Sequence, residues 1–164
     1  MELKCFRTLW GVTTPWPQTL DELQRVGCCG IEARVPLTVA ERRQLADLQA
    51  SGLEYIAILF SGGGVLPAQH ETPEQHLARL QSRFAEASGL NPRFVNLLAG
   101  NDRWPLAQQV DFLGKAHELA AGFGLTCSFE THRATSLYSP WLTLEIIQQL
   151  PQLRFTTSRS LTSA

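Results

Sequence analysis

The chain has 164 residues, of which 44% are hydrophobic and 18% are charged, and its formal net charge at pH 7 is −1. This composition is typical of a soluble globular protein, so we expect a single domain over residues 1–164. The balanced charge and the lack of a Lys/Arg-rich tract argue against nucleic-acid partners. Apolar runs such as Tyr55–Phe60 are too short to cross a membrane.

The N-terminus lacks the apolar core of a signal peptide. The four cysteines form no CxxC pair and are Cys5, Cys28, Cys29 and Cys127. We interpret them as reduced core thiols and expect a cytoplasmic protein.

Short β-rich runs alternate with helical patterns along the whole chain. In chain order, the predicted strands are Cys5–Val12, Gly30–Val35, Tyr55–Phe60, Arg93–Leu98, Thr126–Glu130 and Leu153–Thr156. The predicted helices between them are Thr19–Val26, Thr38–Ala50, Thr72–Ala87, Pro105–Ala121 and Pro140–Leu150.

The starts of these helices carry recognisable capping chemistry. The segments Thr19–Glu22, Thr38–Glu41 and Thr72–Gln75 each fit a capping box, in which a hydroxyl and an acidic or amide side chain satisfy free backbone amides reciprocally. Ser139-Pro140 places a capping residue before a proline at the first helical position. The repeated alternation of short strands and capped helices predicts a parallel α/β protein.

Two parallel architectures are compatible with this alternation, a doubly wound open sheet and a closed barrel. The first loop, Thr13–Pro17, lacks the glycine fingerprint of a dinucleotide-binding fold, which removes the usual argument for the open sheet. The pattern of strands and helices does not choose between the two by itself.

Polar residues at the carboxyl ends of the predicted strands are the candidate functional residues, because these ends carry the sites of parallel α/β folds. They are Glu32 and Arg34, then Asn96, then Glu130 and His132. Residues two apart on a strand share a face, so Glu130 and His132 can point the same way. A carboxylate in such a place needs a metal ion, a cation or a substrate as its partner.

Each candidate also has a structural interpretation. Glu130 can pair with Arg133 or Arg34, and we favour Arg34 as the partner of Glu32. His132 can be a loop imidazole bonded to the backbone. These alternatives stay open on the sequence alone.

Two further features carry weaker signals. Ser61–Gly64 follows the third strand and can cradle an anion, although a plain turn or a flexible loop fits it better. His70 and His76 lie in or after this loop, and we interpret them as surface residues.

The order of these motifs resembles the xylose isomerase-like TIM-barrel family, also called the sugar phosphate isomerase/epimerase superfamily. The matching stretches are Trp10-Gly11, Gly30–Arg34, Pro92–Asn96, Ser128–Arg133 and Ser136–Trp141. The resemblance implies a partial (β/α)8 barrel of about five and a half βα units, with a parallel sheet inside and helices outside.

The resemblance also implies a chemistry. Glu130 corresponds to a strand-five glutamate that binds a divalent metal (Mn, Mg, Co or Zn) and acts as a catalytic base or acid. The implied reaction is metal-assisted proton transfer on a small sugar or hydroxy-keto compound, and a polyol dehydratase is a close variant. The candidate substrate-binding residues are His132, Arg133, Glu32, Arg34, Asn96 and Trp10.

The sequence departs from the family pattern at its end. Residues 156–164 form an atypical polar tail without the Asp and His that the resemblance implies for strand six. We therefore expect a C-terminally truncated barrel with impaired activity, whose open sheet edge a second copy can cover. A non-catalytic degenerate fragment is the main alternative, and an endonuclease for abasic DNA, which has the same fold, is disfavoured by the charge.

Overall fold

The computed structural model describes residues 3–36 and 38–157. The strands within these residues are β1 (Phe6–Thr8), β2 (Gly30–Arg34), β3 (Glu54–Phe60), β4 (Phe94–Leu98), β5 (Cys127–Thr131) and β6 (Arg154–Thr157). The helices are α1 (Trp16–Arg25), α2 (Val39–Ala50), α3 (Pro73–Ser88), α4 (Leu106–Gly122) and α5 (Pro140–Gln149).

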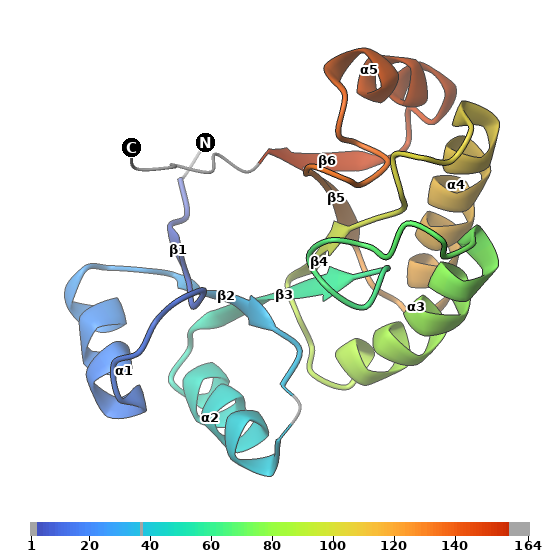
Figure 1. Cartoon of the computed structure of the whole chain (residues 1–164). Coiled ribbons are helices and arrows are strands. Elements are labelled where there is room, and N and C mark those ends of the chain that lie inside the picture. Colours follow the sequence, from blue (N-terminus) through green and yellow to red (C-terminus); the bar gives the residue numbers. More distant parts are fainter. Residues whose placement is uncertain (1–2, 37, 158–164) are drawn as a thin grey trace.

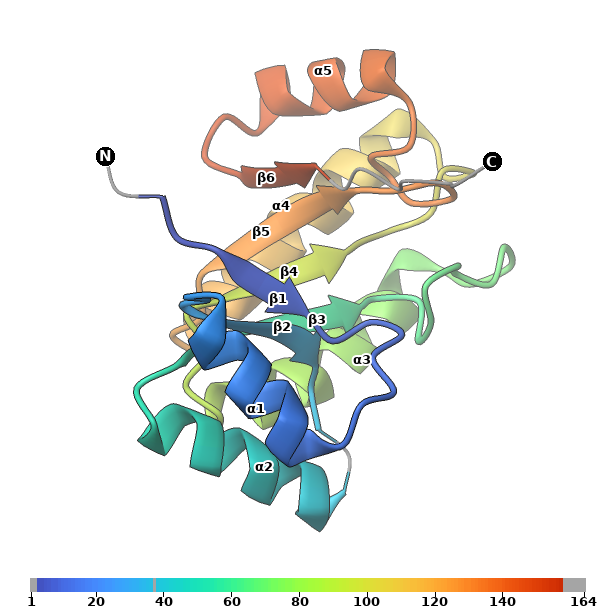
Figure 2. The same ribbon diagram turned by 90° about the vertical axis from the view of Figure 1, so that its left-hand side faces the viewer.

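The described strands form one parallel sheet in the order β1-β2-β3-β4-β5-β6. The sheet curls, and the helices lie on its outer side (Figure 1). Viewed from the side, β1 crosses in front of the sheet with α1 and α2 below it (Figure 2). Sequential order rules out a doubly wound sheet, in which the order reverses. The expected partial TIM barrel is confirmed.

The two faces of the sheet have different roles. On β3, Tyr55, Ala57 and Leu59 face outward and belong to the main hydrophobic core beneath the helices. The alternate residues Ile56 and Ile58 face the inside of the barrel and are also buried. Because β3 is buried on both faces, it reads as a continuous apolar run, as the sequence indicated.

Two of the three predicted capping boxes are present. Thr38 Oγ1 accepts from the Glu41 backbone N–H at 3.2 Å, and the Glu41 carboxylate accepts from the Thr38 N–H at 2.9 Å. Thr72 and Gln75 make the same pair of bonds at 3.4 and 2.9 Å. Reciprocal capping therefore fixes the entry of the chain into α2 and α3.

The capping box predicted at Thr19 is wrong. Helix α1 begins at Trp16, with Pro17 in its first turn, and Thr19 is a buried residue inside the helix. Its hydroxyl contacts the Pro15 carbonyl at 3.3 Å and the Thr14 hydroxyl at 2.9 Å. Proline fixes φ near its helical value, so Pro15-Trp16-Pro17 starts the helix one turn before the expected cap.

The first strand is shorter than predicted. It covers Phe6–Thr8, and the chain then turns, with the Val12 N–H donating to the Leu9 carbonyl at 3.2 Å. Gly11 has a φ of +72°, a conformation that suits glycine and ends the extended run.

The expectations for the tail and the cysteines are only partly confirmed. Thr156 belongs to β6, whereas residues 158–164 of the predicted tail lie outside the described residues. Cys127 is a buried free thiol, and burial raises its pKa to about 12. Cys5 is exposed, so its assignment to the core is wrong. In the described part of the chain, no helix is long and apolar enough to span a bilayer.

We predict that the capping boxes contribute measurably to stability. Thr72→Ala removes the hydroxyl that accepts from Gln75 and should lower the free energy of unfolding by about 1 kcal/mol. Ser139→Ala is the matched control, because Ser139 is the N-cap residue of α5 but its side chain makes no capping hydrogen bond. Urea unfolding measures the free energy of unfolding of both variants. Equal losses of stability in the two variants would contradict the role assigned to the Thr72 hydroxyl.

Candidate functional site

An asparagine inside the barrel joins two glutamates. Asn96 Nδ2 on β4 donates to Glu32 Oε1 on β2 at 3.0 Å and to Glu130 Oε2 on β5 at 2.7 Å. Asn96 is 3% exposed and Glu130 is 8% exposed. The structure thus brings three of the predicted site residues into one hydrogen-bonded cluster.

Strand register explains why these residues meet. Asn96 lies opposite Ser128 on β5, and Glu130 is two residues further along that strand on the same face. β2 and β4 are separated only by β3, and in a TIM barrel alternate strands contribute side chains to the same interior layer. The curl of the sheet therefore lets Glu32 reach Asn96 across the small distance between alternate strands.

The amide of Asn96 suits this position chemically. Its NH₂ group has two donors, one for each carboxylate, which offsets part of the cost of burying negative charge. Its carbonyl oxygen Oδ1 is buried and has no hydrogen-bond partner within the described residues. Buried acceptors are normally satisfied, so this oxygen is an exception within the described residues.

The loop after β5 holds two further predicted residues. His132 Nδ1 is 2.9 Å from the Arg133 carbonyl oxygen, which is the backbone-bonded arrangement kept as an alternative for this histidine. Arg133 itself is exposed. Both residues directly follow the strand that carries Glu130, at the carboxyl end of the sheet.

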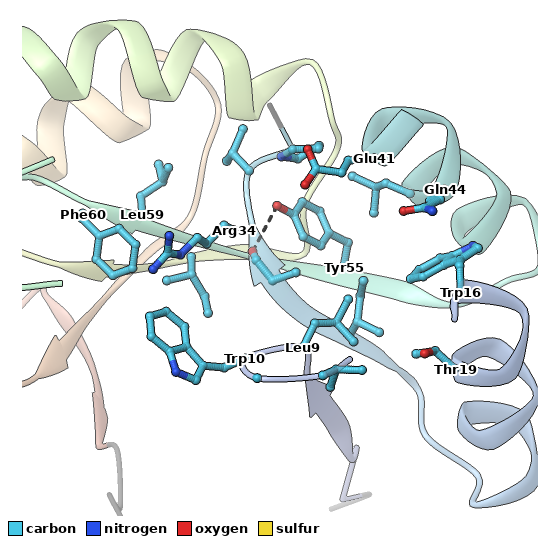
Figure 3. Close-up of a pocket in the computed structure, with 18 of the residues that line it drawn as sticks. Leu9, Trp10, Trp16, Thr19, Arg34, Glu41, Gln44, Tyr55, Leu59 and Phe60 are labelled. Carbon is cyan, nitrogen blue, oxygen red and sulfur yellow. Dashed lines mark hydrogen bonds between the residues drawn. The ribbon is translucent and has the colours of Figure 1, made fainter. Parts of the chain in front are cut away.

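The remaining predicted residues, Arg34 and Trp10, lie together beside a cavity. The Arg34 guanidinium carbon is 4.6 Å from the centroid of the Trp10 ring and 5.1 Å from that of Phe60. The cavity has a volume of about 730 Å³ and extends from these rings toward Trp16 (Figure 3). The expected Glu32–Arg34 pair is absent from the salt bridges of the described residues, since Asn96 holds Glu32 instead.

A buried histidine cluster was missed by sequence reasoning. His76 was interpreted as a surface residue, yet it is fully buried against the rings of Trp104 and Phe112. Its Nδ1 is 2.9 Å from Ser61 Oγ, and its Nε2 is 3.1 Å from the Glu71 carboxylate. The signal was its helical spacing, because His76 lies one turn before the buried Leu80 on α3.

The Ser61 hydroxyl links His76 to the loop after β4. The Gly100 backbone N–H donates to Ser61 Oγ at 2.8 Å, and the same oxygen lies 2.9 Å from His76 Nδ1. Burial lowers the pKa of His76, and the Arg79 hydrogen bond lowers the pKa of Glu71.

This Ser61–His76–Glu71 chain is structural. Ser61 is completely buried, so its hydroxyl is not placed to attack a substrate. The chain instead ties the loop after β3 to the loop after β4, and Trp104 Nε1 adds a bond to the Glu71 carbonyl at 3.0 Å. Both loops lie at the carboxyl end of the sheet, so the cluster fixes part of the barrel mouth.

A divalent metal does not fit the described residues by themselves. Among residues 3–36 and 38–157, no group of three or more His, Cys, Asp or Glu side chains is arranged to hold a metal ion. Between the Glu32 and Glu130 carboxylates stands the Asn96 NH₂ group, which is itself a donor. Hard cations need more oxygen ligands than this pair offers.

By sequence, the chain matches no protein-family model and no curated protein. By structure, it resembles the probable 3-DHS dehydratase AsbF of Bacillus anthracis (TM-score 0.66, 14% identity, 95% of this chain and 62% of that one). An L-ribulose 3-epimerase has a TM-score of 0.66 and 16% identity, and the match covers 95% of this chain and 60% of the epimerase. A xylose isomerase domain protein from Planctomyces limnophilus has a TM-score of 0.63 and 16% identity, and the match covers 94% of this chain and 62% of that protein.

The chain shares the fold of the xylose isomerase-like TIM barrels. It spans about 60% of the length of these three structures. Endonuclease IV from Thermus thermophilus shows the same fold at a TM-score of 0.55 and 13% identity. Because proteins with different activities share this fold, the fold alone does not identify the reaction.

We predict that a third carboxylate in the cluster is strongly destabilising. Asn96→Asp replaces the shared donor by a negative charge between Glu32 and Glu130, which should cost about 3 kcal/mol of unfolding free energy at pH 7. The loss should shrink as the pH falls toward 5, because protonation removes the repulsion. Chemical denaturation at both pH values measures it, and a pH-independent loss would count against the charge cluster.

We also predict a pH dependence from His76. Its pKa in the folded chain is lowered below the ordinary 6.5, so the unfolded chain binds more protons in that range. The stability contributed by neutral His76 is therefore present above pH 6.5 and is lost as the pH falls below it.

Thermal unfolding between pH 7.5 and 5.5 tests this prediction. The melting temperature of His76→Gln should fall less steeply with decreasing pH than that of the unmodified chain, although it starts lower. His70→Gln, at an exposed position in the loop before α3, is the control for the loss of a histidine. Identical slopes in all three chains would show that His76 does not titrate as stated.

Proposed function

We propose that this protein is a sugar isomerase/epimerase-like enzyme that moves a proton at a carbon beside a carbonyl group, on a small sugar or hydroxy-keto compound. The observation that carries the proposal is the Asn96 bridge between Glu32 and Glu130 inside the barrel. The fold shared with an L-ribulose 3-epimerase supports it. A carboxylate held next to hydroxyl-binding groups is what this chemistry needs.

Glu130 is the proposed base. Its carboxylate takes the proton from the carbon next to the carbonyl, and the electron pair of the broken C–H bond moves toward the carbonyl oxygen, giving an enediolate. Return of the proton from Glu130 to the neighbouring carbon gives an isomer. An epimer forms when water donates a proton to the opposite face of the same carbon and Glu130 releases its own proton to solvent. The Asn96 N–H holds the carboxylate in place throughout.

The neighbouring residues bind the substrate in this proposal. The half-buried Glu32 carboxylate accepts hydrogen bonds from substrate hydroxyls, and Asn96 holds that carboxylate in place. His132 and Arg133 contact it from the loop after β5. Trp10 and Arg34 form the wall at the other side of the mouth.

The family resemblance also implies a divalent metal on Glu130, such as Mn, Mg, Co or Zn. The described residues do not complete such a site, so we assign proton transfer to Glu130 and its neighbours. We propose that turnover by these residues is slow. The negative charge that develops on the carbonyl oxygen lies near two carboxylates, and oxygen charge of this kind needs donors or cations for stabilisation.

A non-catalytic role is the alternative, and proton exchange distinguishes the two. The chain is incubated in deuterium oxide with a panel of ketoses and hydroxy-keto acids, with and without manganese, magnesium, cobalt or zinc. Proton NMR then follows deuterium entering the carbon beside the carbonyl, a step that precedes any net conversion. We expect slow exchange with at least one compound.

Glu130→Gln should abolish this exchange, because the amide cannot accept the proton. Glu118→Gln on the exposed side of α4 is the matched control and should exchange at the original rate. No exchange with any compound would favour the non-catalytic alternative, and exchange that survives in Glu130→Gln would assign the base to another residue.

A further inference from the structure

Arg34 is a cation without an anionic partner. Its guanidinium lies against the rings of Trp10 and Phe60, and within the described chain it makes no ion pair or hydrogen bond. Both Arg34 and Trp10 are exposed to solvent at the end of the cavity. Figure 3 shows the three side chains gathered at that end.

The other charged side chains of the cavity are already engaged. Arg83 forms an ion pair with Glu86 at 2.9 Å. Glu41 accepts from both the backbone and the hydroxyl of Thr38 in the capping box of α2. Arg34 is therefore the cation at this cavity whose donors remain available. It shares the inner face of β2 with Glu32, which does not itself line the cavity.

We propose that Arg34 recognises an anionic group, a carboxylate or a phosphate, on the compound that binds in the barrel mouth. This inference rests on the proposed function and names the class of its substrate. A guanidinium has five N–H donors in a planar fork that matches such oxygens in pairs. The guanidinium already packs against two rings before the ligand arrives, so less side-chain entropy is lost on binding.

The position of Arg34 sets the length of the ligand. Arg34 and Glu32 lie two residues apart on the same face of β2, and a strand rises by about 3.3 Å per residue. A ligand whose hydroxyl reaches Glu32 therefore has its anionic group about 7 Å away along the strand. A hydroxylated chain of about five or six carbons with an acidic end spans this distance.

The charges of the site favour one orientation. The Glu32 and Glu130 carboxylates repel the acidic end of such a compound and accept its hydroxyls. Arg34 attracts the acidic end. A neutral sugar lacks the group that fixes this orientation, so the site should discriminate against it.

Three matched six-carbon probes test the proposal: D-glucitol, which is neutral, D-gluconate, which carries a carboxylate, and D-glucitol 6-phosphate. Isothermal titration calorimetry measures their affinities for the full chain. We expect at least one anion to bind about tenfold or more tightly than D-glucitol, as charge-assisted hydrogen bonds allow. The stronger of the two anions identifies the group that Arg34 prefers.

Two variants assign the effect. Arg34→Gln should remove the preference for the anion, and Arg83→Gln, from the same cavity, should keep the preference. The proposal is overturned if neither anion binds more tightly than D-glucitol or if Arg34→Gln retains the preference. Anion binding that depends on Arg34, in a chain without Glu130-dependent proton exchange, would leave this inference standing and refute only the proposed function.

Discussion

The hydrogen bonds from one amide to two carboxylates are the constraint on which the site depends. Glu32 and Glu130 come from strands β2 and β5, and Asn96 on β4 satisfies both through a single nitrogen. Two acidic groups are tolerated in a buried interior only when donors offset their charge. The arrangement also requires the sheet to curl, because a flat sheet would keep β2 and β5 apart.

The hydrophobic core and the loops after the strands hold the sheet in its curled shape and fix the carboxyl end of the barrel. The outer faces of the strands pack beneath the helices in one hydrophobic core, which leaves the inner face for Glu32, Asn96 and Glu130. The buried His76 cluster joins the loops after β3 and β4 at the same end of the sheet. The outer face of the sheet thus provides the hydrophobic packing, and the inner face carries the polar cluster of the site.

The fold was largely predictable from local signals. Continuous apolar strands such as β3 and capping boxes such as that of α2 depend on neighbouring residues and can be read directly. The start of α1 was misjudged because proline chemistry competed with a capping motif at Thr19. Sequential strand order, in contrast, follows from the whole sheet, and the structure was needed to establish it.

The sequence predicted which residues belong to the site, but it predicted only some of the contacts between them. Strand-end position alone selected Glu32, Asn96 and Glu130, whereas their hydrogen bonds depend on register and curvature, which no short motif encodes. For the same reason Arg34 was expected to pair with Glu32 but contacts aromatic rings. His76 was missed because the burial of a histidine on a helix depends on which neighbours cover it.

The most direct test of the account is NMR of the side-chain amide of Asn96, whose two proton resonances are assigned by their loss in Asn96→Ser. If both protons are bonded to carboxylates, they should resonate downfield of exposed amides at pH 7, and Glu32→Gln and Glu130→Gln should each shift mainly one of them. A pair of resonances at exposed-amide positions, unaffected by either variant, would contradict the bridge and the site built on it.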